Sequence, residues 1–279
     1  MILIIGSHGF LGSMLSRSFI KKKYLIRKID KNSKSISEKI DIRDYDALEK
    51  IFKKNKFKFV INCACEPATT RGKEKIFSTN FLGNKNLISL CEKYNIKKYI
   101  FFSTSAIWAK NYFKPVKEST PVNPIEYYGL SKVLAEKSIL KSNLNNWTIF
   151  RVPMIVSSSR LGVLSILFDF ILNNKKIPLL GNGENRLQFL HIDDLFKYIE
   201  KSLKIKEKEI YNLASSQIIT FRNLILELIR SVSSKSKIIF IKDIGFTFVL
   251  KILNKIGLSP LNIYHLTMLK SSLTLDCSK

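Results

Sequence analysis

The chain has little acid, few cysteines and no long apolar run. It carries 22 Asp and Glu against 47 Lys and Arg over 279 residues, a formal net charge of +25. Its four cysteines, two of them Cys63 and Cys65, lack the paired spacing of a zinc site and are too few for a disulfide framework. No apolar run reaches the roughly 18 to 20 residues of a transmembrane helix. We therefore expect no metal site, no spanning helix and reduced thiols.

The first residues, Met1–Ile5, lead directly into Gly6 without the basic region and cleavage site of a secretion signal. A cytoplasmic protein is therefore expected. Because 46% of the residues are hydrophobic, the chain is a folded globular protein rather than a disordered one.

The positive charge favours anionic partners such as nucleotides and sugar diphosphates. No module with interleaved basic and aromatic residues is present, so we expect no nucleic-acid partner. The segment 244–266 is apolar and basic. It predicts a helix packed on the core of its lobe, and the alternative is peripheral contact with an anionic membrane surface.

Short apolar runs alternate with amphipathic stretches in the first half of the chain. The runs predict buried strands at 2–5, 24–29, 57–64, 98–104 and 147–152. The stretches predict helices near 10–22, 44–54, 72–94 and 126–142. Since parallel strands need long crossovers, which are usually helices, this order predicts an α/β protein with a Rossmann-type doubly wound parallel sheet.

After Pro153 the pattern becomes less regular and cannot form a second complete sheet. We expect a doubly wound, nucleotide-binding domain of residues 1–155 and about 186–213. A smaller C-terminal substrate lobe is expected from about 156–185 and 214–279, at the carboxyl edge of the sheet, where open α/β folds bind ligands.

Three glycines follow the first predicted strand and open the first predicted helix, with the spacing G-x-x-G-x-x-G. Glycine allows a tight turn and a close approach of the backbone to a pyrophosphate, while the helix N-terminus offers N–H groups and partial positive charge. The alternative is that the glycines only permit strand-to-helix packing. The residues predicted to line a dinucleotide site here are Gly6, His8, Gly9, Phe10, Leu11 and Gly12.

Asp30 ends the second predicted strand, about 20 residues beyond the glycines. A carboxylate at this position accepts hydrogen bonds from the adenosine ribose and repels a 2′-phosphate, which favours NAD over NADP. The neighbouring Arg27, Lys28 and Lys31 leave NADP open, because a basic side chain there accommodates the phosphate.

Tyr128 and Lys132 lie four residues apart at the start of a predicted helix, hence on one face. Lowering the pKa of a tyrosine from about 10 to about 7 requires about 4 kcal/mol. A cation roughly 4 Å away, at an effective dielectric constant of about 20, supplies an energy of that order. Lys132 would therefore make Tyr128 a proton acceptor.

Hydroxyl side chains follow at the mouth of the strand predicted at 98–104, in the run Ser103-Thr104-Ser105. A hydroxyl there can hydrogen-bond a substrate oxygen as its proton leaves. The alternative is that these residues cap a turn.

Together these motifs resemble the extended short-chain dehydrogenase/reductase family, in its NAD-dependent sugar epimerase/dehydratase branch. The resemblance extends over nearly the whole chain. Further segments that carry it are Asp41-Ile42-Arg43-Asp44, Asn62-Cys63-Ala64, Asn80-Phe81-Leu82-Gly83, the run 103–108, Gly181-Asn182-Gly183-Glu184-Asn185-Arg186, His191-Ile192-Asp193-Asp194 and Tyr211-Asn212-Leu213.

The resemblance implies a role for individual residues. Thr104, Tyr128 and Lys132 correspond to the catalytic triad. The implied cofactor-binding residues, besides the glycine turn and Asp30, are Asp41, Ile42, Cys63, Ala64, Asn80, Tyr128 and Lys132. The implied substrate-binding residues are Ser105, Arg186 and Gln188. Arg186 would face a diphosphate through its bidentate guanidinium, and the alternative for it is a surface salt bridge.

The departures from the family's pattern bear on the reaction. Its sugar 4,6-dehydratases carry Thr-Asp-Glu where this chain has Thr104-Ser105-Ala106, which disfavours dehydration. We expect an NAD-dependent epimerase acting at C4 of a nucleotide-diphosphate-linked hexose, for surface polysaccharide biosynthesis. The alternatives are an NAD(P)H-dependent 4-keto-sugar reductase, an epimerase of polyprenyl-diphosphate-linked sugars and a non-catalytic NAD-binding regulator.

Two further expectations come from the same resemblance. A homodimer is expected, because related enzymes usually dimerise. The run Leu275–Lys279 resembles a D-x-S-K run that normally leads into a further helix. We therefore expect either that the natural chain continues or that the last element is lost.

Overall fold

A six-stranded parallel sheet forms the centre of the computed structural model, which describes residues 1–108, 112–158, 164–241 and 271–279. The strand order is β10-β5-β4-β3-β1-β2. The strands are β1 (Ile2–Ile5), β2 (Ile26–Ile29), β3 (Phe59–Asn62), β4 (Lys98–Thr104), β5 (Trp147–Val152) and β10 (Lys208–Asn212). The predicted parallel sheet is confirmed.

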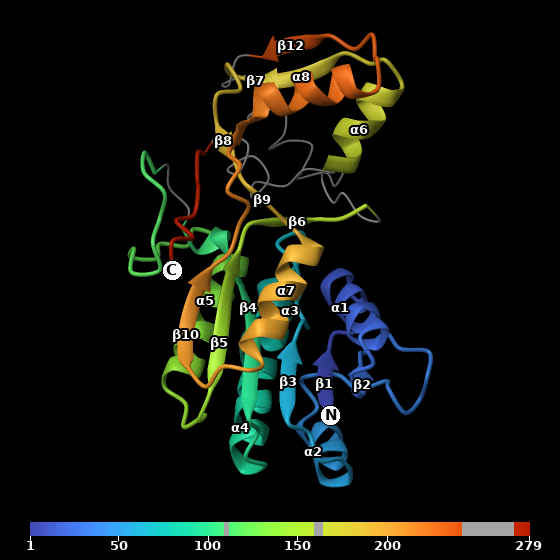
Figure 1. Ribbon diagram of the computed structural model, residues 1–279, viewed down its shortest axis with the longest axis vertical. Helices are drawn as coiled ribbons and strands as arrows, with labels where there is room; N and C mark the ends of the chain where they lie inside the picture. Colours follow the sequence, from blue (N-terminus) through green and yellow to red (C-terminus); the bar gives the residue numbers. More distant parts are fainter. Residues whose placement is uncertain (109–111, 159–163, 242–270) are drawn as a thin grey trace.

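Helices cover both faces of this sheet (Figure 1). One face carries α1 (Phe10–Lys21) and α7 (Ile192–Ser202). The other carries α2 (Tyr45–Lys54), α4 (Asn84–Lys93) and α5 (Tyr127–Leu140). The sheet is therefore doubly wound, as the alternation of strands and helices predicts.

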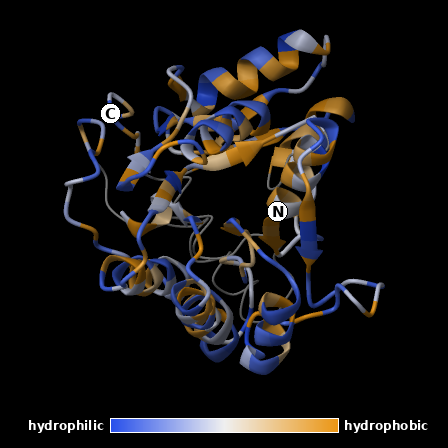
Figure 2. Cartoon of the chain, turned by 60° about the horizontal axis from the view of Figure 1, so that its bottom comes forward, coloured by the Kyte–Doolittle hydropathy of each residue, from blue (hydrophilic) through white to orange (hydrophobic). Residues whose placement is uncertain are grey.

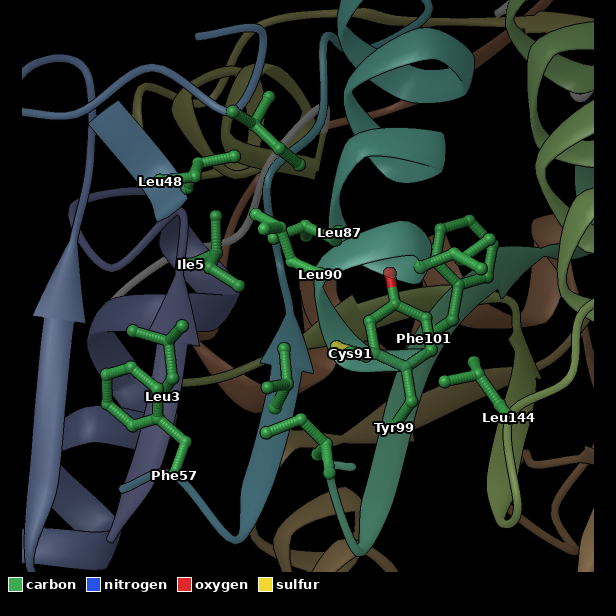
Figure 3. Close-up of a cluster of buried hydrophobic side chains, with 14 of the residues drawn as sticks. Leu3, Ile5, Leu48, Phe57, Leu87, Leu90, Cys91, Tyr99, Phe101 and Leu144 are labelled. Atoms are coloured by element: carbon green, nitrogen blue, oxygen red, sulfur yellow. The ribbon is translucent and has the colours of Figure 1, made fainter. Parts of the chain in front are cut away.

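Alternate side chains of the strands enter two separate cores. Leu3 packs with Leu48 and Leu87 from α2 and α4 (Figure 3), whereas Ile4 packs on the side of α1 and α7. Because both faces are buried, the inner strands β1, β3 and β4 are mostly apolar runs rather than alternating ones. The covering helices contain both hydrophobic and hydrophilic residues (Figure 2), as amphipathic helices do.

The second half of the chain adds a smaller lobe beyond the carboxyl ends of the strands (Figure 1). Its strand pairs are β6 (Met154–Val156) with β9 (Phe189–His191), β8 (Arg186–Leu187) with β11 (Ile219–Thr220), and β7 (Ile177–Leu180) with β12 (Ile238–Ile241). Helices α6 (Leu164–Leu172) and α8 (Phe221–Ser231) pack around Ile171, Leu179 and Ile225. The residue boundaries predicted for the two domains stay a prediction.

The single helix predicted at 72–94 consists of three elements. These are α3 (Lys73–Phe77), a π-helical turn η1 (Ser78–Gly83) and α4. The wider turn lets Asn80 reach the loop after β3, where it donates to the Glu66 carbonyl at 3.0 Å and accepts the Glu66 N–H at 2.8 Å. Helical periodicity predicts the helix but not this turn, which long-range contacts stabilise.

Membrane association was one alternative for this chain. Within the ranges that the structure describes, no helix combines the length and the apolar character that a membrane crossing needs. The segment 244–266 lies outside the described residues. Peripheral membrane contact and a cytoplasmic location therefore stay predictions.

A buried ion pair joins β5 to α5. Arg151 donates from Nε and Nη2 to the two carboxylate oxygens of Glu136, at 3.1 and 2.7 Å, and from Nη1 to the Glu118 carbonyl at 2.8 Å. The two side chains are only 6% and 5% exposed, and the guanidinium lies 5.0 Å from the centre of the Trp108 ring. The pair therefore helps to hold α5 against the sheet.

The variant Arg151→Met should leave the Glu136 carboxylate buried without its partner. We expect the free energy of unfolding to fall by about 3–5 kcal/mol, measured by urea denaturation. The double variant Arg151→Met/Glu136→Leu should recover most of this loss. A loss below about 1 kcal/mol in the single variant, the range of an exposed pair, would contradict the buried pairing.

Candidate active site

The carboxyl ends of β1 and β3 form the switch point of the sheet. The chain leaves β1 for β2 on one side, and β3 and the later strands lie on the other side of β1. A switch point leaves a crevice at the carboxyl edge, and open α/β sheets bind their ligands there. The residues that directly follow the strand ends are Gly6, Asp30 and Cys63, and Thr104 is the last residue of β4.

The glycine turn after β1 leaves no room for a side chain at Gly6 or Gly12. Gly6 has a φ of +76°, and a Cβ there would lie 2.6 Å from the backbone nitrogen of Ala64. A Cβ on Gly12 would lie 2.2 Å from the Gly6 carbonyl oxygen. The turn therefore packs directly on the loop after β3, which brings the predicted residues Gly6 and Ala64 into contact.

Helix α1 begins directly after this turn. Its N-cap, Gly9, offers no capping side chain, and its first turn contains no acidic residue. No carboxylate of that turn competes with a phosphate for the partial positive charge of the helix N-terminus. The close backbone approach and the uncapped helix together fit the pyrophosphate of a dinucleotide.

Asp30 is bound to the glycine turn from the end of β2. Its Oδ2 accepts the His8 N–H at 2.9 Å and its Oδ1 accepts the Asn32 N–H at 2.8 Å. The side chain is buried, with 7% of the residue exposed. Because a carboxylate oxygen can accept a second hydrogen bond, Asp30 keeps the capacity to bind a ribose hydroxyl.

Asp41 and Ile42, which the family resemblance implies as cofactor-binding residues, lie on the segment that leads into α2. Arg43 donates to both carboxylate oxygens of Asp41, at 3.0 and 2.7 Å, and this hydrogen bonding holds the pKa of Asp41 below its ordinary value. Ile42 is buried against Gly83, where a Cβ would lie 2.6 Å from Ile42 Cγ2. The contact brings this segment against η1.

Lys132 is held at the end of β4. Its Nζ donates to the Phe102 carbonyl at 2.8 Å and lies 4.7 Å from the centre of the Phe101 ring. Tyr128 is the second residue of α5, one helical turn before Lys132, and it is partly exposed. The buried ammonium and the phenol therefore share one face of α5 beside the strand end.

Thr104 is buried where β4 ends. Its Oγ1 accepts the Ala106 N–H at 3.2 Å, so the hydroxyl caps the short 3-10 turn that follows. Turn capping was the alternative role predicted for the run 103–105. A hydroxyl oxygen that accepts one bond still has its proton to donate. Capping and substrate binding are therefore compatible at this residue.

Asn80 links the loop after β3 to the helix that carries Tyr128. Its Nδ2 donates to Ser131 Oγ at 3.0 Å, and Ser131 Oγ donates to the Tyr128 carbonyl at 2.7 Å. Together with its two bonds to Glu66, this makes Asn80 a connector of three segments. The predicted cofactor contact of Asn80 stays a prediction.

Cys63 lies close enough to Lys132 for the ammonium to affect the pKa of its thiol. Burial raises the pKa of the Cys63 thiol well above its ordinary value, and the Lys132 ammonium opposes this shift only in part. A raised pKa favours the protonated thiol over the thiolate that a nucleophile needs. The position is consistent with a residue that lines a site rather than one that reacts.

The three residues predicted to bind substrate have different surroundings. Ser105 is buried in the turn after β4, and Arg186 is exposed on β8. Gln188 is buried, donates from Nε2 to the Ser215 carbonyl at 2.7 Å and accepts the Leu275 N–H at 2.8 Å. Its amide therefore holds two main-chain segments together, and its substrate contact stays a prediction.

Gly129 sets the distance between α5 and the turn after β4, and this role was not predicted from the sequence. A Cβ at Gly129 would lie 2.6 Å from the Ala106 carbonyl oxygen and 3.1 Å from Pro124 Cβ. Glycine costs a helix about 1 kcal/mol relative to alanine. A glycine between Tyr128 and Lys132, in the first turn of a predicted helix, was the available signal.

The fold and this site define a dinucleotide-binding enzyme of the Rossmann type, with its ligand site at the switch point of a parallel sheet. The chain belongs to the NAD dependent epimerase/dehydratase family, whose model matches residues 2–214. The resemblance seen in the sequence is thereby confirmed, and with it the expectation of an enzyme with an NAD cofactor.

Individual similarities agree with this family. A Methanocaldococcus jannaschii protein provisionally named a UDP-glucose 4-epimerase is 30% identical over 238 residues, which cover 78% of this chain and 77% of that protein. Two crystal structures superpose with a TM-score of 0.76 and 20% identity. One is a UDP-glucose 4-epimerase of Thermotoga maritima with UDP-glucose, covering 96% of both chains. The other is a dTDP-4-dehydrorhamnose reductase of Clostridium acetobutylicum, covering 88% of this chain and 85% of that one.

The variant Gly129→Ala separates helix propensity from packing at the site. Propensity alone predicts a gain of about 1 kcal/mol in the free energy of unfolding. The close contact with Ala106 predicts instead a loss of about 1–3 kcal/mol, as in other overpacked sites. Urea denaturation measures the sign, with Ser138→Ala near the other end of α5 as the control. A stabilised Gly129→Ala protein would contradict the close approach of α5.

Proposed function

We propose that the protein is an NAD-dependent epimerase that inverts C4 of a hexose linked to a nucleoside diphosphate. The observation that carries the proposal is the buried Lys132 ammonium at the end of β4, one helical turn from Tyr128 and beside the strand end with Thr104. Such a group of side chains takes one proton from an alcohol and returns it. Epimerisation needs both directions.

Tyr128 is the proposed proton carrier. The positive charge of Lys132 favours the phenolate over the phenol. The phenolate accepts the proton of the C4 hydroxyl while the Thr104 hydroxyl donates a hydrogen bond to the same oxygen. Bound NAD supplies the reversible hydride acceptor that oxidation at C4 requires. When the keto sugar has presented its opposite face, the hydride would return to C4 from the reduced cofactor and Tyr128 returns the proton to the oxygen, which completes the inverted alcohol.

The two residues after Thr104 support a reaction of hydride and proton transfer alone. Ser105 and Ala106 are both buried, and neither side chain is an acid or base at neutral pH. Elimination of water needs a general acid and a general base at the leaving group and the neighbouring carbon. This strand end provides neither, so dehydration is not proposed.

The nucleotide-sugar substrate is proposed from two further observations. Arg186 presents an exposed guanidinium on β8, in the lobe beyond the strand ends, and a guanidinium binds a diphosphate in bidentate fashion. The Methanocaldococcus jannaschii relative, 30% identical, carries the name of a UDP-glucose epimerase. An epimerised sugar of this kind would feed surface polysaccharide synthesis. Assembly into a homodimer stays a prediction.

A 4-keto-sugar reductase would use the same three side chains in one direction, with Tyr128 as the proton donor. The fold does not separate the two reactions, since solved structures of both kinds superpose equally well. If the sugar were linked to a polyprenyl diphosphate instead of a nucleoside diphosphate, the proton and hydride transfers at the sugar would stay the same.

Incubation with a panel of nucleotide sugars, followed by NMR of the products, tests the proposal. We expect a C4-inverted sugar to accumulate with NAD present in catalytic amounts only. Consumption of one NADH or NADPH for each keto sugar reduced would overturn the epimerase and identify the reductase.

The variant Tyr128→Phe removes the proton carrier and keeps the ring. We expect turnover to fall by about 10²–10⁴-fold, the usual contribution of acid–base catalysis, while NAD still binds. Tyr127→Phe makes the same change one residue earlier, at an exposed ring, and should keep full turnover. Equal turnover in the two variants would contradict the mechanism.

A further inference from the structure

Six basic residues lie on β2 and in the segment that leads to α2, and four of them are bound to an oxygen of the protein itself. The pairs are Arg27 with the Ser37 carbonyl, Lys28 with Glu38, Lys31 with Glu66 and Arg43 with Asp41. Arg27, Lys28 and Lys31 are the cations that leave NADP open in the sequence. Their pairing bears on which adenosine ribose the site accepts.

Lys31 is the cation that matters most, because it directly follows Asp30. Asp30 is buried and bound through His8 to the glycine turn, which places it at the ribose of a dinucleotide held by that turn. Lys31 turns to the loop after β3 instead, where its Nζ donates to Glu66 Oε1.

Hydrogen bonds from Thr70 and Asn80 hold Glu66 in place, and Lys31 binds to it there. Its Oε2 accepts the Thr70 hydroxyl at 3.1 Å, and its backbone N–H and carbonyl are both bound by the Asn80 amide at 2.8 and 3.0 Å. A second ammonium, that of Lys75, lies 3.9 Å from Oε2. The Glu66 side chain is only 10% exposed.

We propose that Glu66 determines the cofactor preference of this chain by holding Lys31 away from the 2′ position of the adenosine ribose. A 2′-phosphate would need a cation to offset its repulsion by Asp30, and Glu66 already binds Lys31, the cation that directly follows Asp30. The inference rests on the dinucleotide site of the family and not on the choice between epimerase and reductase, so it holds or fails independently of the reaction.

The variant Glu66→Gln tests this role. Glutamine keeps the shape of the side chain but removes the negative charge, which leaves Lys31 free to bind a 2′-phosphate. The measurement is the ratio of the dissociation constants of NADP⁺ and NAD⁺ for the full chain, obtained by isothermal titration. Because the two nucleotides differ only in the 2′-phosphate, general damage to the site cancels in the ratio. We expect the ratio to shift toward NADP⁺ by about tenfold, a change of about 1.4 kcal/mol.

Two variants make the assignment specific. Glu49→Gln is the matched control, because Glu49 is also a little-exposed carboxylate, at 14%, that binds two lysines, Lys53 at 3.0 Å and Lys93 at 2.5 Å. It should leave the ratio unchanged. The double variant Glu66→Gln/Lys31→Met should return the ratio to that of the original chain. An unshifted ratio in Glu66→Gln, an equal shift in Glu49→Gln, or a shift that survives in the double variant would overturn the proposal.

Lys31→Met alone provides a test that does not depend on replacing the buried Glu66. If Glu66 holds Lys31 away from the ribose, removing the ammonium leaves the ratio as it is. A ratio that moves further toward NAD⁺ by about fivefold or more would show that Lys31 already contacts the phosphate, and would refute the role of Glu66.

Discussion

Direct contact between main-chain segments at the switch point of the sheet is the constraint on which the site depends. Gly6 and Gly12 lie so close to neighbouring backbone that neither position has space for a Cβ. This closeness brings the turn after β1 against the loop after β3, and it lets Asp30 accept a bond from the backbone of His8. The parts of the site that recognise a nucleotide are thus joined to one another before any ligand binds.

The elements of the doubly wound sheet could be predicted because strands buried on both faces form short apolar runs, as in β1 and the centre of β4. Local patterns also indicated the glycine turn and the Tyr128/Lys132 pair. The features that could not be predicted depend on contacts between distant segments. The π-helical turn at Asn80 meets the loop at Glu66, and Gln188 binds Leu275, a partner 87 residues away. No local periodicity carries such information.

Carboxylates are scarce in this chain, and two of the buried ones join separate elements or loops of the fold. Glu136 ties α5 to β5 through Arg151, and Glu66 ties the loop after β3 to Lys31. Each of these two carboxylates fixes the position of a cation as well as neutralising its charge. In a protein of net charge +25, the position of a few carboxylates decides which cations remain free to meet an anionic ligand.

The central claim is that a phenol, an ammonium and a threonine hydroxyl meet beside the reactive end of a dinucleotide held by the turn at Gly6. A crystal structure of the protein with NAD bound tests this claim most directly. The account predicts the pyrophosphate on the N-terminus of α1 and the nicotinamide beside Tyr128 and Thr104. A dinucleotide bound elsewhere, or a nicotinamide out of reach of the Tyr128 hydroxyl, would contradict it.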